Sequence, residues 1–189
     1  MPGYGYVLAL ESLEDVKITG CVFDGVRAAL KLGHVSRAYI GYNEFTNMGS
    51  DGVNMGDCHD IDIHENLFHR FNPTPLAHPD SVQCNTATDR YPRCSNITVR
   101  DNTITGMCQG MLIRDVDGVL VARNTIHNGE PTGIGVQNCT KAVIDSNTLR
   151  TMASVLYQSR IDTRETTDMT WLGSNTTAAH RNSKQVIYS

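Results

Sequence analysis

An internal repeat of 22 or 23 residues limits the folds that are open to this chain. Each copy reads apolar-x-apolar-x-x-Asn-x-apolar, with Cys21 replacing the asparagine in the first copy. The aligned asparagines are Asn43, Asn66, Asn102, Asn124 and Asn147. Counted from Cys21, the spacings in this column are 22, 23, 36, 22 and 23 residues, so one copy is longer than the rest. Such a period is typical of solenoids, in which each repeat contacts only its neighbours.

A second short segment of alternating apolar residues follows each of the first five copies. These segments read AALKLG, DGVNMG, DSVQCN, QGMLIR and TGIGVQ. Alternation predicts strands, and the separation between them is too long for hairpins and carries no helical pattern. Like strands of successive repeats should therefore stack in parallel. The sequence predicts an all-β fold, a parallel β-helix of about six to seven coils.

The predicted solenoid covers residues 1–158, with loop insertions at 70–80 and 85–94. Residues 159–189 lose the period and are expected to form an irregular C-terminal cap or an oligomer contact. At the other end, "YVLALESLED" aligns with the second strand of a coil whose first strand is missing. Because a half-coil is a poor cap, we expect a longer β-helix or another covering element there.

The repeating asparagines are interpreted as structural. An asparagine at the same turn of every coil can adopt a positive φ and form hydrogen bonds with the asparagines above and below. Such a ladder would satisfy polar groups at a buried bend.

The cysteines also occupy defined positions in the repeat. Cys58, Cys94 and Cys139 share a column just before the first strand, Cys84 takes an inward position, and Cys21 stands in the asparagine column. They are interpreted as small apolar residues of the interior. A Cys84–Cys94 or a Cys58–Cys94 disulfide stays open.

Charge and hydropathy exclude some classes of function. A net charge of −4 gives no electrostatic footprint for nucleic acid. No apolar run approaches the roughly 18 residues of a membrane span, and the start lacks the features of a signal peptide.

The long repeat holds the stretch "NPTPLAHPDSVQCNTATDRYPRC", which starts at Asn72 and ends at Cys94. One insertion precedes the strand "DSVQ" and another follows it. Loops that flank one strand of a rigid sheet are where function usually lies. We therefore expect the functional site on this strand.

Counting through the repeat places Asp80 directly over Asp51. Neighbouring coils are about 4.8 Å apart, so these carboxylates should repel and one should have a raised pKa. Acid/base and glycoside chemistry both use such pairs. We expect Asp80 to be the general acid/base or nucleophile, Asp51 its partner and His78 a second proton carrier.

A polar strip should surround this pair on one face. The alignment of the repeats places Gln83 over Asn54, and residues of the second insertion could also reach this face. The expected substrate-binding residues are Gln83, Asn54, Arg114, Gln109, Lys31, Tyr91 and Arg93.

Simpler interpretations stay open for the same residues. Asp51 and Asp80 each follow a turn, where aspartate often bonds its own backbone. His78 precedes a proline and could be only a loop residue, and Arg114 could be only a surface charge. No metal site is expected at the three neighbouring histidines, because they fall in different columns: His59, His64 and His69.

From about Val7 to Gln158, the chain resembles the right-handed parallel β-helix superfamily of pectate lyases, polygalacturonases, alginate lyases and epimerases, and phage tailspikes. The segment Gly49-Ser50-Asp51-Gly52 is similar to the Asn-Thr-Asp-Gly strand of polygalacturonases, and Asp80 to their later paired aspartates, with Ser81 in place of the second acid. The resemblance implies binding of an extended polysaccharide along one sheet face. Pectate lyases hold calcium with acids, a role open to Asp51 and Asp80; no other cofactor is expected.

The leading hypothesis is a polysaccharide lyase, hydrolase or epimerase. The rival is a non-catalytic glycan-binding or structural segment of a phage tailspike or surface fibre. The protein is expected to be a monomer or a homotrimer, located outside the cell, in the periplasm or on a virion.

Overall fold

The computed structural model describes residues 5–73, 77–86, 92–156 and 158–178. Within these ranges the chain forms strands β1–β21 and no helix. No helix that could cross a membrane is therefore found in the described part of the chain.

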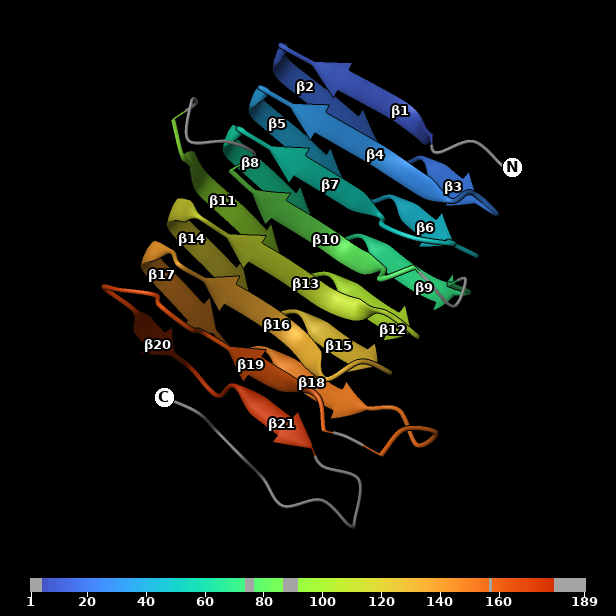
Figure 1. Cartoon of the computed structure of the whole chain (residues 1–189), viewed down its shortest axis with the longest axis vertical. Coiled ribbons are helices and arrows are strands. Elements are labelled where there is room, and N and C mark those ends of the chain that lie inside the picture. The colour runs from blue at the N-terminus through green and yellow to red at the C-terminus, as the bar shows by residue number, and fades with distance from the viewer. Residues whose placement is uncertain (1–4, 74–76, 87–91, 157, 179–189) are drawn as a thin grey trace.

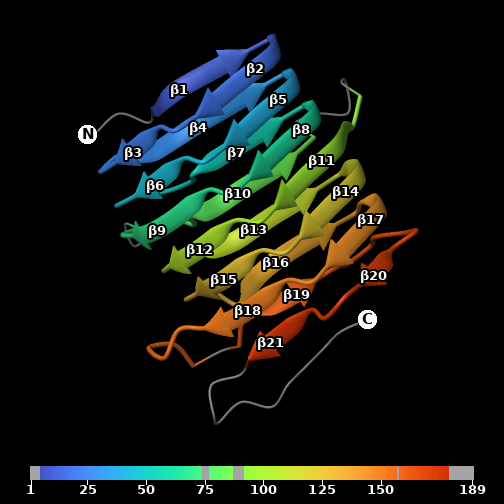
Figure 2. The same ribbon diagram turned by 180° about the vertical axis from the view of Figure 1, so that it is seen from behind.

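The strands form three parallel sheets that wind as a solenoid (Figures 1 and 2). Sheet A contains β1 (Tyr6–Glu11), β4 (Ala28–Gly33), β7 (Val53–Gly56), β10 (Asp80–Asn85), β13 (Gln109–Arg114), β16 (Thr132–Gln137) and β19 (Arg160–Asp162). Sheet B contains β2 (Glu14–Thr19), β5 (Ser36–Gly41), β8 (His59–His64), β11 (Cys94–Arg100), β14 (Val116–Ala122), β17 (Thr140–Asp145) and β20 (Thr170–Leu172). Sheet C contains β3 (Val22–Asp24), β6 (Glu44–Thr46), β9 (Leu67–Phe71), β12 (Thr103–Gly106), β15 (Thr125–Asn128), β18 (Thr148–Thr151) and β21 (Thr176–Ala178).

Successive coils stack in the register that the repeat predicts. Val82 pairs with Val53 on one side and with Met111 on the other, and all three side chains are fully buried. The inward columns of the three sheets thus meet in one continuous apolar core. The all-β parallel β-helix of about seven coils is confirmed.

Sheet C is a feature that the sequence analysis missed. Two strands per coil were expected, but the asparagine turn divides the first of them between sheets B and C. The sheet C strands are three to five residues long, and so short a strand shows hardly any alternation. Its apolar column is clear in the structure, where Phe23, Phe45 and Phe68 stack face to face.

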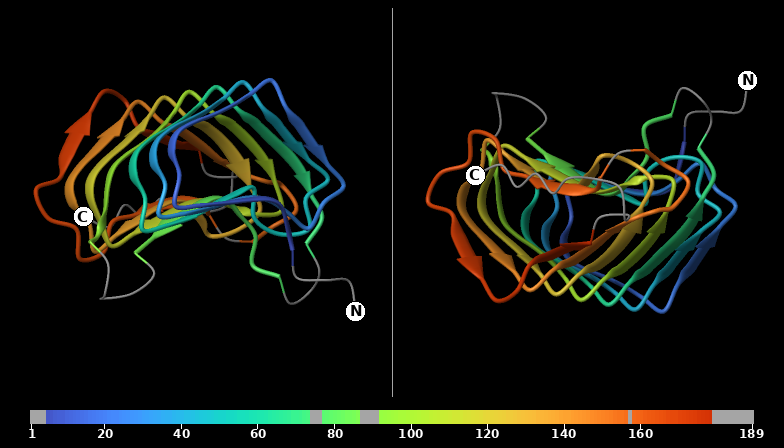
Figure 3. Two further views of the ribbon diagram at one scale, coloured as in Figure 1. Left: turned by 90° about the horizontal axis from the view of Figure 1, so that it is seen from above. Right: turned by 90° about the horizontal axis from the view of Figure 1, so that it is seen from below.

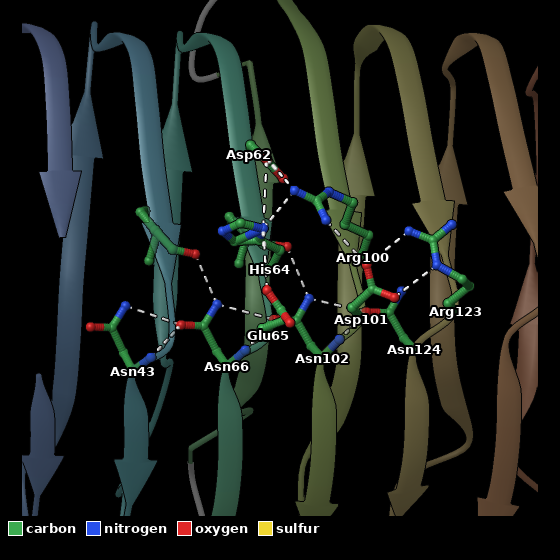
Figure 4. Close-up of polar contacts among 12 residues, drawn as sticks. Asn43, Asp62, His64, Glu65, Asn66, Arg100, Asp101, Asn102, Arg123 and Asn124 are labelled. Atoms are coloured by element: carbon green, nitrogen blue, oxygen red, sulfur yellow. Dashed lines mark hydrogen bonds and ion pairs between the residues drawn. The ribbon is translucent and has the colours of Figure 1, made fainter. Parts of the chain in front are cut away.

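The asparagine ladder is confirmed, with one correction to its backbone. Asn66 Nδ2 donates to Asn102 Oδ1 at 3.0 Å and also to the Ile40 carbonyl (Figure 4). The ladder runs on to Asn175. The expected positive φ lies on the preceding residue, for example Glu65 or Asp101, because this residue makes the turn and the asparagine begins the next segment.

All six cysteines are free. Cys58, Cys84, Cys94 and Cys139 are buried as expected, with the Cys94 sulfur accepting the Cys58 backbone N–H at 3.2 Å. The expectation that Cys21 belongs to the interior was wrong. Its side chain is exposed, since it lies between β2 and β3, which are the terminal strands of sheets B and C in the described part of the chain.

The three sheets continue past the expected boundary at residue 158. Strands β19, β20 and β21 add a further coil, in which Ile144 pairs with Trp171 and Thr148 with Thr176. Residues 179–189 lie outside the described part of the chain, and the cap or oligomer contact expected for residues 159–189 stays a prediction.

Candidate functional site

The outward column of sheet A joins residues that are far apart in the sequence. Lys31 pairs with Asn54, and Asn54 pairs with Gln83, as the stacking frame predicts. The described ends of both insertions leave the solenoid on this same side, one at each edge of the sheet (Figure 3). The insertions thus border the polar column at β10.

Asp51 and Asp80 occupy the column at the start of the sheet A strands. The Asp80 backbone N–H donates to Asp51 Oδ1 at 3.0 Å, and Asn54 Nδ2 donates to Asp51 Oδ2 at 3.2 Å. Asn54 Nδ2 also contacts Gln83 Oε1 at 2.5 Å. These bonds orient the Asp51 carboxylate, joining it to Asp80 of the next coil and to Asn54 of its own coil.

A local break in the strand alternation lets Asp51 face outward. Gly52 faces the core, since a Cβ there would lie 2.7 Å from Phe68 Cε1 and 2.6 Å from the Ser81 carbonyl oxygen. Val53 also faces the core. With two successive residues directed inward, Asp51 and Asn54 lie together outside.

Asp80 is the most perturbed carboxyl of this site. Its side chain is only 1% exposed, and neither carboxyl oxygen has a hydrogen-bond partner among the described residues. Burial, and next the charge of Asp51, raise its pKa to about 8, although the charge of Arg114 acts in the opposite direction. The group is therefore largely protonated at neutral pH. The predicted raised pKa is thus present, but burial contributes more to it than repulsion does.

His78 and Gln109 lie beside Asp80. Gln109, in the next coil, pairs with Asp80. The side-chain Nε2 of Gln109 donates to His78 Nε2 at 3.0 Å. Pro79, which separates His78 from Asp80, is buried, and its carbonyl accepts the Gln109 backbone N–H at 2.9 Å. This contact holds the described end of the first insertion against β13.

The other expected binding residues lie elsewhere. Arg114 pairs with Asn85 at the far end of β10. Arg93 does not reach the strip, because its Nε lies 3.3 Å from Asp117 Oδ1 and its Nη2 donates to the Asn138 carbonyl. Tyr91 lies outside the described residues.

A family model described as "Right handed beta helix region" matches residues 7–151. The chain belongs to the right-handed β-helix family. The crystal structure of alginate lyase from Paenibacillus sp. str. FPU-7 is similar to this β-helix, with a TM-score of 0.51 and 12% sequence identity over 90% of this chain and 75% of that chain. At this identity the likeness establishes the fold alone. Among curated proteins, none matches the chain in sequence.

The β-helix has a polar hollow that the sequence analysis did not identify. Its volume is about 230 Å³, and it lies where the sheet A strands turn toward sheet B. The lining residues are Arg114, Asp115, Gln137, Asn138, Arg164 and Glu165. The available signal was the column in which Gln137 pairs with Arg114. Arg164 follows β19 in a segment where the repeat is too weak to assign columns.

Sheet B carries a separate cluster of charged side chains (Figure 4). Arg100 Nη2 donates to Asp62 Oδ2 at 2.8 Å and to His64 Nδ1 at 2.6 Å. His64 is nearly buried, and its ring fills the space that a side chain at Gly41 would need. Arg100 thus joins Asp62 and His64 of the neighbouring coil, while His64 Nε2 and Asp62 Oδ1 are buried without a hydrogen-bond partner among the described residues.

The described residues do not support a metal centre. His59 contacts Ser95 and His69 contacts Glu44, so these histidines do not converge. No group of three potential metal-binding side chains occurs in the described ranges. Calcium takes about six to eight oxygen ligands, to which Asp51 and Asp80 would contribute only their carboxylates, so a calcium role for this pair stays a prediction.

Proposed function

We propose that this β-helix cleaves or modifies an extended polysaccharide on the outer side of sheet A, with Asp80 as the proton donor. A buried carboxyl group that stays protonated near neutral pH carries the proposal. It lies on the strand between the two insertions and next to a second carboxylate. Perturbed titratable groups in such settings are candidates for catalysis.

A protonated Asp80 can give its proton to the leaving oxygen of a glycosidic bond. That step is common to hydrolysis and elimination, since both must neutralise a departing alkoxide. Asp51 lies one coil away, where a carboxylate can stabilise positive charge or receive the next proton. His78 is exposed at the edge of the site and could carry protons between solvent and the carboxyl pair.

The geometry leaves the reaction type open between lyase, hydrolase and epimerase. A lyase needs a base for the sugar C5 proton and a cation for the enolate-like carboxylate. A hydrolase needs only the pair of carboxyl groups.

A non-catalytic glycan-binding or structural β-helix is the second candidate. The 1% exposure of Asp80 favours it, because a substrate cannot touch this carboxyl until the residues that cover it move. The two candidates therefore differ in whether Asp80 is ever uncovered.

A polysaccharide panel separates them. The protein is incubated with acidic and neutral polysaccharides while ultraviolet absorbance and reducing ends are followed. An unsaturated product indicates a lyase, and reducing ends without it indicate a hydrolase; an epimerase is detected by the changed sugar composition. No reaction on any polymer would favour the binding candidate.

Asp80→Asn tests the assigned residue. We expect at least a 100-fold loss of turnover, typical for removal of a general acid. Asp168→Asn is the matched control, since Asp168 is exposed and its positive φ of 51° suits asparagine. Retained turnover in Asp80→Asn would remove Asp80 from the mechanism.

A further inference from the structure

Arg100 joins two coils of the β-helix on sheet B, a different sheet from that of the candidate site (Figure 4). Its Nη2 donates to Asp62 Oδ2 at 2.8 Å and to His64 Nδ1 at 2.6 Å. Asp62 and His64 lie on β8, whereas Arg100 is the last residue of β11. The same two coils place Asp51 and Asp80 on sheet A, so Arg100 crosses the junction that also lies within the candidate site.

The contact with Arg100 determines where His64 carries its proton. An arginine side chain has only donors and stays charged, so the ring nitrogen that it contacts must be an acceptor. His64 Nδ1 therefore carries no proton, and the neutral ring has its proton on Nε2. A proton on Nδ1 would remove the acceptor and place a second positive charge 2.6 Å from Arg100 Nη2. This contact and the protonation of His64 thus exclude each other.

Packing holds the His64 ring in this position. The residue is only 3% exposed, and its Nε2 lies where a Cβ at Gly41 would be, at 2.4 Å. The edge of one ring meets the face of the other between His64 and Tyr39, with 4.3 Å between the centroids. Nε2 is buried and has no hydrogen-bond partner among the described residues. The arrangement with Arg100 therefore leaves one buried donor unsatisfied, which costs free energy.

Two carboxylates also face the His64 ring. Asp62 Oδ2 lies 3.8 Å and Glu65 Oε2 lies 4.0 Å from Nδ1. Glu65 already forms a hydrogen bond with the Tyr42 hydroxyl, whereas Asp62 Oδ1 is buried without a partner in the described ranges. Asp62 is therefore the acceptor that is open to a protonated Nδ1. The other titratable or charged groups that face the ring from neighbouring strands are Tyr39, Tyr42, Arg100 and, beyond Tyr39, Lys17.

Arg100 has a second acceptor besides Asp62. Its Nη1 donates to Asp101 Oδ2 at 3.2 Å. Arg123, from the next coil, donates to both oxygens of Asp101 at 2.8 Å. The bonds from Arg123 are the main reason that the pKa of Asp101 is lowered, so this carboxylate stays charged in mildly acidic solution. Arg100 can thus give up His64 and still keep two carboxylates as partners.

We propose that the contact between Arg100 and His64 is a pH-sensitive switch between these two coils. While His64 is neutral, Arg100 binds His64 and Asp62 together. When Nδ1 takes up a proton from solvent, it donates to Asp62 Oδ1, and Arg100 keeps only Asp62 Oδ2 and Asp101. Histidine is the side chain suited to such a change between about pH 5 and 8. The inference does not depend on the proposed function.

Nuclear magnetic resonance of the full chain, labelled with ¹⁵N, tests the switch between about pH 8 and pH 5. The ring-nitrogen signals of His64 distinguish an acceptor Nδ1 from a protonated one, and the guanidinium signals report on Arg100. We expect an acceptor Nδ1 and a protonated Nε2 at the upper pH. On acidification Nδ1 should become protonated, and the Arg100 signals should shift in the same step. The Arg123 signals should stay in place, because Arg123 contacts Asp101 and not His64.

His64→Gln separates the switch from other effects of pH. The glutamine Oε1 can accept from Arg100 at every pH, so the Arg100 signals should no longer shift over this range. His127→Gln is the matched control, since His127 is a half-buried histidine of β15 in sheet C. It should leave the shift of the Arg100 signals unchanged.

Three results would overturn the switch. In the wild type, these are a proton on His64 Nδ1 at about pH 8 or its absence at about pH 5, and protonation of His64 that leaves the Arg100 signals in place. In His64→Gln, it is a shift of the Arg100 signals as large as in the wild type. The wild-type spectra decide the question even if the variant does not fold.

Discussion

Replacing Asp80 with asparagine should stabilise the protein at neutral and alkaline pH, even though it removes the proposed catalytic group. Asparagine is close to aspartate in size and is neutral at every pH. It therefore leaves the packing around β10 nearly unchanged while it removes the need to bury a carboxylate. The wild-type side chain is 1% exposed and lacks a hydrogen-bond partner in the described part of the chain, so its ionisation is not compensated.

The size of the effect follows from the pKa of Asp80. This pKa is about 8 in the folded protein and roughly 3.9 in an unfolded chain. At 1.36 kcal/mol for each pKa unit, ionising Asp80 costs the folded state about 6 kcal/mol more than the unfolded chain. Water that enters beside the carboxylate reduces this cost, so we expect about 2–4 kcal/mol in practice.

The direction of the pH dependence is fixed by which state binds the proton more tightly. The folded protein does, so the stability linked to Asp80 is fully present below about pH 4. It is lost progressively as the pH rises from about 4 to about 8, and it is absent above that range. The advantage of Asp80→Asn over the wild type should therefore grow from about pH 5 to about pH 8 and then remain constant.

Guanidinium chloride denaturation followed by circular dichroism measures this advantage. The wild type, Asp80→Asn and the exposed control Asp168→Asn are compared at successive pH values between about 5 and 9. Asp168→Asn should follow the wild-type curve throughout. A constant difference between Asp80→Asn and the wild type over this range would refute the reasoning, since Asp80 would then not be held protonated by its surroundings.

Three further substitutions test the asparagine ladder and the packing beside the site. Asn102→Ala should lower the free energy of unfolding by about 3–5 kcal/mol, because four hydrogen bonds of a buried side chain are lost. Asn175→Ala, at the half-buried end of the ladder, should cost about 1–2 kcal/mol, and equal costs in urea denaturation would contradict the ladder's role. Gly52→Ala should cost about 1–3 kcal/mol and lower any turnover, because its Cβ would lie 2.7 Å from Phe68 Cε1. Unchanged thermal stability in that variant would mean that the two coils are less closely packed than the structure indicates.

The residues that pair between adjacent coils at the site could be predicted from the sequence, because parallel stacking pairs residues one period apart. Counting alone placed Gln83 beside Asn54 and Lys31 beside Asn54, as the register confirms. The 36-residue spacing did not disturb this count. Both insertions leave the solenoid outside the strand β10, so the strand itself keeps its place in the stack.

Other features could not be predicted, because the repeat does not determine them. The course of the insertions depends on contacts that occur once, such as Arg93 with Asp117 and His78 with Gln109. Periodicity also does not tell which residue of a turn takes the positive φ, and the structure places it one residue before each asparagine. The burial of Asp80 does not follow from its column either, since Gln109 in the same column of the next coil is only half-buried.

The residues that occupy the Asp80 column in other coils indicate whether the fold itself needs an acid there. The same column holds Ala28, Gln109 and Thr132 in other coils, so the stack does not require an acid at this point. A buried carboxyl without hydrogen-bond partners lowers stability instead of adding to it. Groups that reduce stability are expected mainly where activity needs them. A scaffold role alone therefore leaves Asp80 unexplained, whereas a proton donor kept ready near neutral pH requires the burial that makes Asp80 costly.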